Sequence, residues 1–350
     1  MAELSTPPKM TTAPIDADTF FKWFACRCPA LITAMVVIDR TGHPRPGPAV
    51  APLASRPSSL GLLDRLPTEI LFLVLGMLDT QSVPHVACAS FKGAMLVRSH
   101  PEYQNLRHYA PQALAALAMT ETANLHSVRW LHMALRSERC VLCPGFGFFL
   151  FLPTGERCCD ECLRSSPYCE MIDIEDARRG FLLSNSQLKQ LAILHVPPRT
   201  FWVQRKANRG KLRIVRKQAA RELALTLWPR AWRESEGPPP HQVHPSDVVT
   251  PANDFYEMAS IELPSVSKDG AVEEGFWCSA CRLFASTWPA RPKALFMEHV
   301  QACSHARGQA NRFPSETTRD RKINAHTKWE EGLKQRVRKF GRQPEWPEWI

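Results

Sequence analysis

A dense hydrophobic run extends from Leu66 to Leu78, where nine of thirteen residues are Leu, Ile, Val, Phe or Met. It predicts a short helix, because Pro67 suits a first helical turn and the polar residues 79–82 end the run. The apolar positions fall on two adjoining stripes: Ile70, Val74 and Met77 on one, and Leu71, Leu75 and Leu78 on the other. Both stripes need covering, and the run is shorter than the about 20 apolar residues that cross a bilayer. We therefore expect protein, and no membrane, to cover them.

The pattern continues with a second predicted helix from Val83 to Val97, which Ser82 can cap and in which Pro84 can occupy the first turn. The stretch from Pro111 to Arg136 is rich in Ala and Leu and predicts further helix. Two short helices leave much apolar surface uncovered, which a partner chain could cover.

Three segments of this region resemble the F-box family. They are Leu66-Pro67-x-Glu69-Ile70-Leu71, then Val83-x-x-Val86-x-x-Ala89-Ser90-Phe91, and His100-Pro101-x-Tyr103-x-x-Leu106. The match covers roughly residues 60 to 108 and departs from the family at residues 89–92, where Val-Ser followed by Arg or Lys and an aromatic residue is more usual.

The resemblance implies docking onto the Skp adaptor of an SCF-type, cullin-based ubiquitin ligase. The implied partner-binding residues are Leu66, Pro67, Ile70, Leu71, Val74, Leu75, Leu78, Val83 and Val86. The alternative is that the run is an ordinary buried core helix.

Composition limits the class of protein. The chain has 350 residues, 44% of them hydrophobic, which suits two or three domains. Thirty prolines against sixteen glycines favour modules on extended connectors. The net charge of +10 is compatible with acidic partners, nucleic acid among them, but it is spread over much of the chain.

The twelve cysteines bear on the compartment. Residues 1–18 are polar and do not resemble a signal peptide, so we expect a reducing compartment, cytoplasmic or nuclear. There, cysteines paired at two-residue spacing are more typical of metal sites than of disulfides.

The first cysteine cluster consists of two Cys-x2-Cys pairs separated by fifteen residues: Cys140, Cys143, Cys159 and Cys162. The spacing is typical of a structural zinc site, because each tight turn directs two thiolates at one metal. Residues 146–155 predict a strand and a turn, and hence a hairpin with the ligands at its tips. Either Cys158 or Cys159 could be the third ligand. We prefer Cys159 because it forms a Cys-x2-Cys pair with Cys162, and we expect Cys158 and Cys169 not to bind the metal. Four free, partly buried thiols are the alternative.

The second cluster is a Cys-x2-Cys pair followed, seventeen residues later, by a His-x3-Cys pair: Cys278, Cys281, His299 and Cys303. Residues 294–303 have the composition of a helix, on which positions four apart share one face and one metal. His305 is a reserve fourth ligand. We expect two structural zinc ions, since four-ligand sets leave no open position for catalysis. The arrangement also resembles fungal F-box proteins with a late Trp-Cys-x2-Cys and a helix carrying His and Cys.

Between the clusters we expect helices at 174–183, 186–194 and 216–227, and a basic hairpin at 201–215 with its turn at Asn208-Arg-Gly210. Its cations are Arg199, Arg205, Lys206, Arg209, Lys211, Arg213, Arg216 and Lys217. They could form a nucleic-acid surface or a solvated hairpin face. Residues 20–39 predict one short element without assigned function.

The predicted fold class is mainly α with small β elements. The predicted units are a largely disordered Pro-rich leader (1–59), the F-box (60–108), a helical connector (109–139), a first zinc region with the basic hairpin (140–233), a linker (234–251), a second zinc region (252–310) and a basic tail (311–350).

The leading hypothesis is a non-catalytic ligase subunit that holds an unknown protein substrate near ubiquitin-transfer enzymes. The rival is a zinc-binding regulator associated with nucleic acid, without a ligase role. An enzyme is not expected, because the chain shows no Gly-rich phosphate loop, nucleophile elbow or His-Glu-x-x-His.

Overall fold

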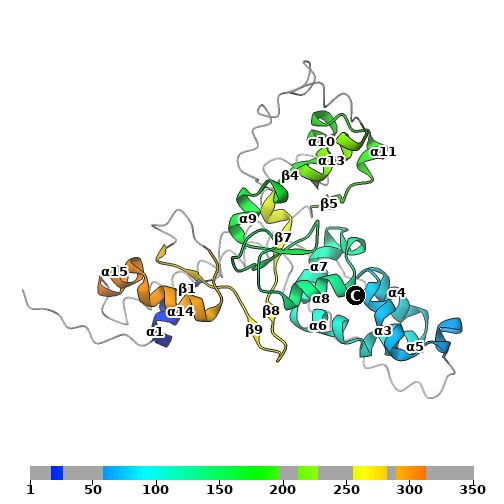
Figure 1. Cartoon of the computed structure of the whole chain (residues 1–350), viewed down its shortest axis with the longest axis horizontal. Coiled ribbons are helices and arrows are strands. Elements are labelled where there is room, and N and C mark those ends of the chain that lie inside the picture. Colours follow the sequence, from blue (N-terminus) through cyan, green and yellow to red (C-terminus); the bar gives the residue numbers. More distant parts are fainter. Residues whose placement is uncertain (1–16, 27–57, 197–211, 228–254, 282–288, 313–350) are drawn as a thin grey trace, which may run out of the picture.

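Figure 1 presents a computed structural model of the chain, in which residues 17–26, 58–196, 212–227, 255–281 and 289–312 are described. This part is mainly helical with small antiparallel sheets, which confirms the predicted fold class. Its buried residues form three separate hydrophobic clusters: a large one in the centre, a small one that includes Phe296 and Val300, and another that includes Ala177 and Ala220. None of the described helices has the length and apolar character that crossing a membrane would require.

The region predicted as an F-box is built mainly from short helices. It consists of η1 (Gly61–Arg65), α3 (Thr68–Met77), α4 (Ser82–Ala89), α5 (Phe91–Ser99) and α6 (Pro101–Tyr109). Pro67 stands just before α3, at the N-cap, and not within its first turn.

The helix predicted from 83 to 97 is broken at Ser90. This residue is extended, with φ −160°, and its hydroxyl accepts a hydrogen bond from the Gly93 amide, so it ends α4 and caps α5. The tight corner needs Gly93, since a Cβ there would lie 2.4 Å from the carbonyl oxygen of Val86.

The helix predicted from 111 to 136 is also interrupted. It is divided into α7 (Pro111–Met119), η2 (Ala123–Leu125) and α8 (Val128–Arg136). Glu121 lies between them with φ 58°, a left-handed conformation that a helix cannot contain, and Ser127 caps α8. α8 buries Val128, Leu131 and Leu135 and packs on α3 and α6.

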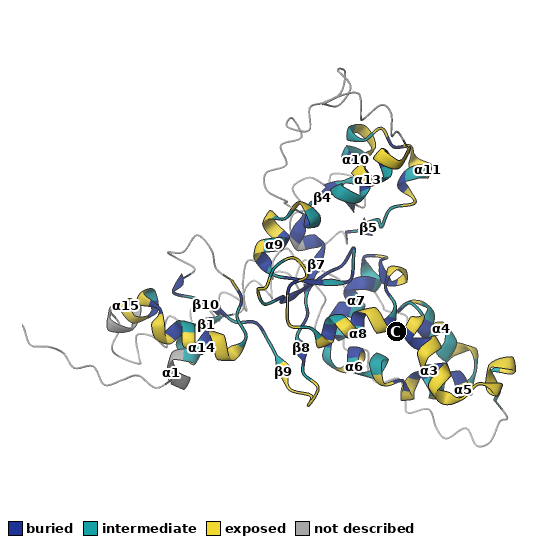
Figure 2. Cartoon of the chain, in the orientation of Figure 1, coloured by how far each residue is buried: buried dark blue, intermediate teal, exposed yellow. Residues whose placement is uncertain are grey.

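The centre of the molecule is a three-stranded antiparallel sheet of β2 (Phe149–Phe151), β3 (Glu156–Cys158) and β7 (Ser260–Glu262), in the order β3-β2-β7. β2 is buried over its whole length, and Figure 2 shows the neighbouring strand β7 mainly in the dark blue of buried residues. The short elements α9 (Asp160–Ser165), η3 (Pro167–Cys169) and η4 (Tyr256–Met258) and the pair β8 (Ser265–Val266) and β9 (Val272–Glu273) complete this part.

A second sheet has the order β4-β6-β5, with β4 (Met171–Asp173), β5 (Leu194–His195) and β6 (Arg213–Arg216). It packs with α10 (Ile174–Gly180), α11 (Asn185–Leu188) and α13 (Lys217–Leu227). The helices expected at 174–183 and 216–227 are close to α10 and α13. The helix expected at 186–194 ends at Leu188 instead, and Leu194 enters β5, where its side chain is fully buried. The proposed turn at 208–210 lies outside the described residues.

The remaining unit joins the two ends of the described chain. α1 (Ala17–Phe24) packs on α14 (Lys293–Ala302), and β1 (Ala25–Cys26) packs on β10 (Trp277–Cys278). α14 in turn contacts α15 (Ser304–Arg312). The short element expected within residues 20–39 overlaps α1 and β1, although α1 begins slightly earlier, at Ala17. The predicted linker at 234–251 and the tail beyond 312 lie outside the described residues.

Candidate metal centres and an exposed apolar face

The first candidate metal centre is assembled at the base of the β2–β3 hairpin. Cys140 and Cys143 lie in the turns before β2, while Cys159 caps α9 and Cys162 lies in its first turn. Because Phe149 pairs with Cys158, both cysteine pairs stand at the open end of the hairpin. The expectation of ligands at the hairpin tip is therefore wrong: the turn at 152–155 is at the opposite end.

The four sulfur atoms of this centre converge. All lie within 4.8 Å of one another, and Cys143 Sγ is 3.6 Å from Cys159 Sγ. Tetrahedral coordination with metal–sulfur bonds of about 2.3 Å separates the sulfurs by about 3.8 Å, so this spacing fits a metal ion. The Leu142 amide donates to Cys140 Sγ, and the Cys162 amide donates to Cys159 Sγ, both at 3.4 Å. Such bonds orient the sulfurs and favour their thiolate form.

The pKa shifts of the cysteines in this centre are also consistent with a site for a cation. Hydrogen bonds with Cys158 and Cys159 lower the pKa of Cys140. The hydrogen bond with Cys140, followed by burial, raises the pKa of Cys159, and burial raises the pKa of Cys162 to about 12. One thiolate thus opposes ionisation of its neighbours, and a positive ion is the counter-charge that would hold four thiolates together.

The two cysteines that were predicted not to bind the metal, Cys158 and Cys169, are not among the four converging sulfurs. Cys158 and Cys169 are fully buried, with their sulfurs 4.0 Å apart. Cys158 points into the main core from the end of β3, and its backbone neighbour Cys159 contributes the sulfur to the set.

The second candidate centre gathers the four residues predicted for it. Cys278 ends β10, Cys281 follows it, His299 lies in the last turn of α14, and Cys303 caps that helix at its C-terminus. Cys281 Sγ lies 3.3 Å from His299 Nε2 and 3.5 Å from Cys303 Sγ.

The surroundings of this second centre also suit a metal. The Ala306 amide donates to Cys303 Sγ at 3.4 Å, so Cys303, and not His305, completes the set of converging atoms. Burial lowers the pKa of His299, which favours the neutral imidazole that ligation requires.

The apolar face expected to bind a partner is divided between the inside and the outside of the fold. Leu71, Leu75 and Val83 are buried in the chain's own core, and Leu78 and Val86 are half-buried. The other four predicted residues, Leu66, Pro67, Ile70 and Val74, are exposed.

One side of α3 is thus apolar and open to solvent. We call it the α3 stripe: Ile70, Leu73, Val74 and Met77, which are 42%, 51%, 40% and 74% exposed. Their spacing of i, i+3, i+4 and i+7 places them on one helical face. The residues predicted from the sequence for partner binding did not include Leu73 or Met77, although Met77 was placed on this side of the helix.

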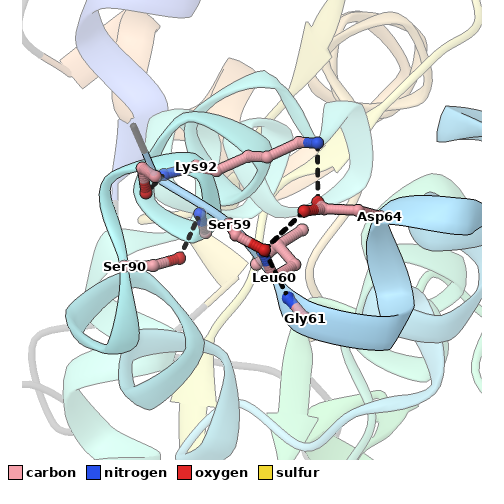
Figure 3. Close-up of polar contacts among 8 residues, drawn as sticks. Ser59, Leu60, Gly61, Asp64, Ser90 and Lys92 are labelled. Atoms are coloured by element: carbon pink, nitrogen blue, oxygen red, sulfur yellow. Dashed lines mark hydrogen bonds and ion pairs between the residues drawn. The ribbon is translucent and has the colours of Figure 1, made fainter. Parts of the chain in front are cut away.

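The segment before α3 is attached to the start of α5 by polar contacts (Figure 3). Asp64 forms a 2.6 Å ion pair with Lys92 and accepts a hydrogen bond from the Ser59 hydroxyl at 2.7 Å. The interaction with Lys92 lowers the pKa of Asp64 to about 2. This anchoring leaves Leu62 and Leu63 of η1 exposed beside the approach to α3.

Comparison with known proteins identifies no relative of this chain. The chain matches no known protein family, no curated protein and no solved structure.

Proposed function

We propose that this chain is an F-box-type adaptor, a non-catalytic protein that binds a Skp adaptor through the α3 stripe together with Leu66 and Pro67. Through this contact it would bring a protein substrate to a cullin-based ubiquitin ligase. The observation that supports the proposal most is the open apolar stripe on a helix whose opposite side packs into the core. A contiguous exposed apolar patch of this kind is typical of an interaction site.

The buried and the exposed sides of α3 have different roles in the proposal. Leu71 and Leu75 would attach the helix to the core and so present the stripe in a fixed orientation. A preformed face loses little conformational entropy on binding, which favours affinity. The partner-binding set is accordingly narrowed to exposed residues: Leu66, Pro67, Ile70, Leu73, Val74 and Met77.

Both candidate metal centres suit zinc in a structural role. Their donor sets, four cysteines in one and three cysteines with one histidine in the other, are those of structural zinc sites and fill its tetrahedral coordination. Zinc would thus hold the fold of the part that faces the substrate, and it would supply no reaction.

The rival function, binding to nucleic acid, rests on the basic segment at 199–217, most of which lies outside the described residues. Binding to a generic DNA duplex that weakens steeply with added salt would favour it.

The proposal is tested by co-purification of the folded full-length chain with a Skp adaptor. Ile70→Glu combined with Val74→Glu places two charges on the exposed stripe and leaves the core unchanged. We expect binding to fall at least about tenfold, equivalent to about 1.4 kcal/mol.

The matched control is Leu295→Glu, which places a charge at a similarly exposed apolar position on α14. It should bind as the wild type does. Absence of binding by the folded wild type, or full binding by the double variant, would refute the proposal.

A further inference from the structure

The second candidate metal centre has a hydrophobic core of its own, and part of that core comes from the opposite end of the chain. The cluster contains Phe24, Cys278, Ala280, Cys281, Phe296, Val300, Cys303 and Ala306. Phe24 belongs to α1, and three members of the cluster are candidate ligands. The ligands and the N-terminal segment therefore share a single small core.

Aromatic contacts join α1 to this module. The Phe21 ring lies 4.9 Å from the Phe276 ring and 5.6 Å from the Phe296 ring, both in edge-on geometry. Lys293 Nζ lies 5.2 Å from the centre of the Phe21 ring. Figure 1 shows α1 beside α14, the helix that carries His299.

Backbone pairing attaches the same segment to the cysteine knuckle. β1 pairs with β10, so that Ala25 is opposite Cys278 and Cys26 is opposite Trp277. The Ser279 amide donates to the Phe24 carbonyl at 2.9 Å, and the Cys26 thiol donates to the Trp277 carbonyl at 3.4 Å. The turn that contains Cys278 and Cys281 is thus held by backbone contacts with residues 24–26.

The core of this module is small, so we expect its stability to depend on a bound metal ion. A core of eight buried residues is small for independent stability, and small modules commonly obtain their folding free energy from a bound metal. α1 has eight residues, too few to be stable as an isolated helix. We therefore expect that neither α1 nor the turn from Cys278 to Cys281 holds its position alone.

We propose that residues 21–26 complete the second metal centre, so that metal binding and docking of the N-terminal segment stabilise each other. The inference rests on the proposed zinc occupancy of that centre. Linkage is reciprocal: a change in the segment that weakens metal binding implies that loss of the metal weakens docking by the same factor.

The first arm of the test measures zinc release from the full-length chain under a mild chelator. The Phe24→Ala chain should release zinc from the second centre at least about tenfold faster, as is typical when residues supporting metal ligands are removed. The first centre serves as an internal standard and should release zinc as in the wild type. Phe24→Leu, which restores most of the buried volume, should return release towards the wild-type rate, and Leu188→Ala, in a different cluster, should leave both centres unchanged.

The second arm measures amide hydrogen exchange of residues 21–26 in full-length variants. Cys281→Ser should increase their exchange, whereas Cys143→Ser, at the other centre, should not. Unchanged zinc release in Phe24→Ala, or unchanged exchange in Cys281→Ser, would overturn the linkage while leaving two-site zinc binding intact. A wild-type chain that binds zinc only at the first centre would overturn the zinc assignment itself, and the inference with it.

Discussion

Arg157 connects three separate parts of the main core with one side chain. Its guanidinium is almost fully buried and donates to four backbone carbonyls, those of Ala134, Gly147, Leu263 and Pro264. Burial lowers the pKa of Arg157 to about 9, so the group stays protonated near neutral pH. The residue thereby joins α8, the approach to β2 and the end of β7.

Replacing Arg157 by leucine should lower the free energy of unfolding by roughly 3 kcal/mol or more, because several buried carbonyls lose their donor. Denaturant unfolding of the metal-loaded chain measures the change. Arg178→Leu is the control: its exposed ion pair with Glu175 should contribute less than about 1 kcal/mol. Equal losses in the two variants would contradict the role given to Arg157.

The neighbouring residues Cys158 and Cys159 offer a comparison within one dipeptide. Cys159→Ser removes a candidate ligand and should abolish zinc binding at the first centre, whereas Cys158→Ser should retain it. Metal content measured by native mass spectrometry distinguishes them. Loss of zinc in the Cys158 variant but not in the Cys159 variant would reverse the ligand assignment.

At the scale of elements, hydrophobic spacing predicted the positions of helices better than their ends. The expected helix at 294–303 is α14, and the run from 66 to 78 contains α3. The spacing of apolar residues did not reveal the break at Ser90, because the break depends on the side-chain cap by Ser90 and on the close approach of Gly93 to Val86. It also could not show which side of α3 is buried, because the helix is apolar on both sides.

The α4–α5 corner provides a test at this scale. Gly93→Ala should destabilise the chain by at least about 1 kcal/mol, since the added Cβ would meet the Val86 carbonyl oxygen and the backbone would have to shift. Gly180→Ala, with open space around the added methyl group, should change stability by less than about 1 kcal/mol. Thermal unfolding compares the two, and similar unfolding temperatures would contradict the close packing at Gly93.

At the scale of the whole molecule, both candidate ligand sets follow from spacing in the sequence, because paired cysteines need only local geometry. The packing of α1 and β1 against the second centre does not follow from the sequence, since no local pattern links residues 24–26 to residues 277–279. The apolar residues Phe21 and Phe24, one helical turn apart, were the available signal of a packed helix, but they carry no information about its partner.

The separate clusters predict an ordered response to metal removal. The first centre adjoins the main core, whereas the second lies in a small cluster of its own. Increasing chelator should therefore unfold the second module before the central sheet. Hydrogen exchange that rises first in β10 and α14 and later in β2 would agree, while a single concerted rise would disagree.

The pairing of β1 with β10 also has a consequence for synthesis of the chain. Cys26 and Trp277 are 251 residues apart, so at ordinary translation rates the N-terminal strand leaves the ribosome roughly 10–50 s before its partner. During that interval Phe21 and Phe24 lack the aromatic neighbours that cover them in the finished fold. Completion of this module is therefore a late event, which begins only after the central sheet has been synthesised.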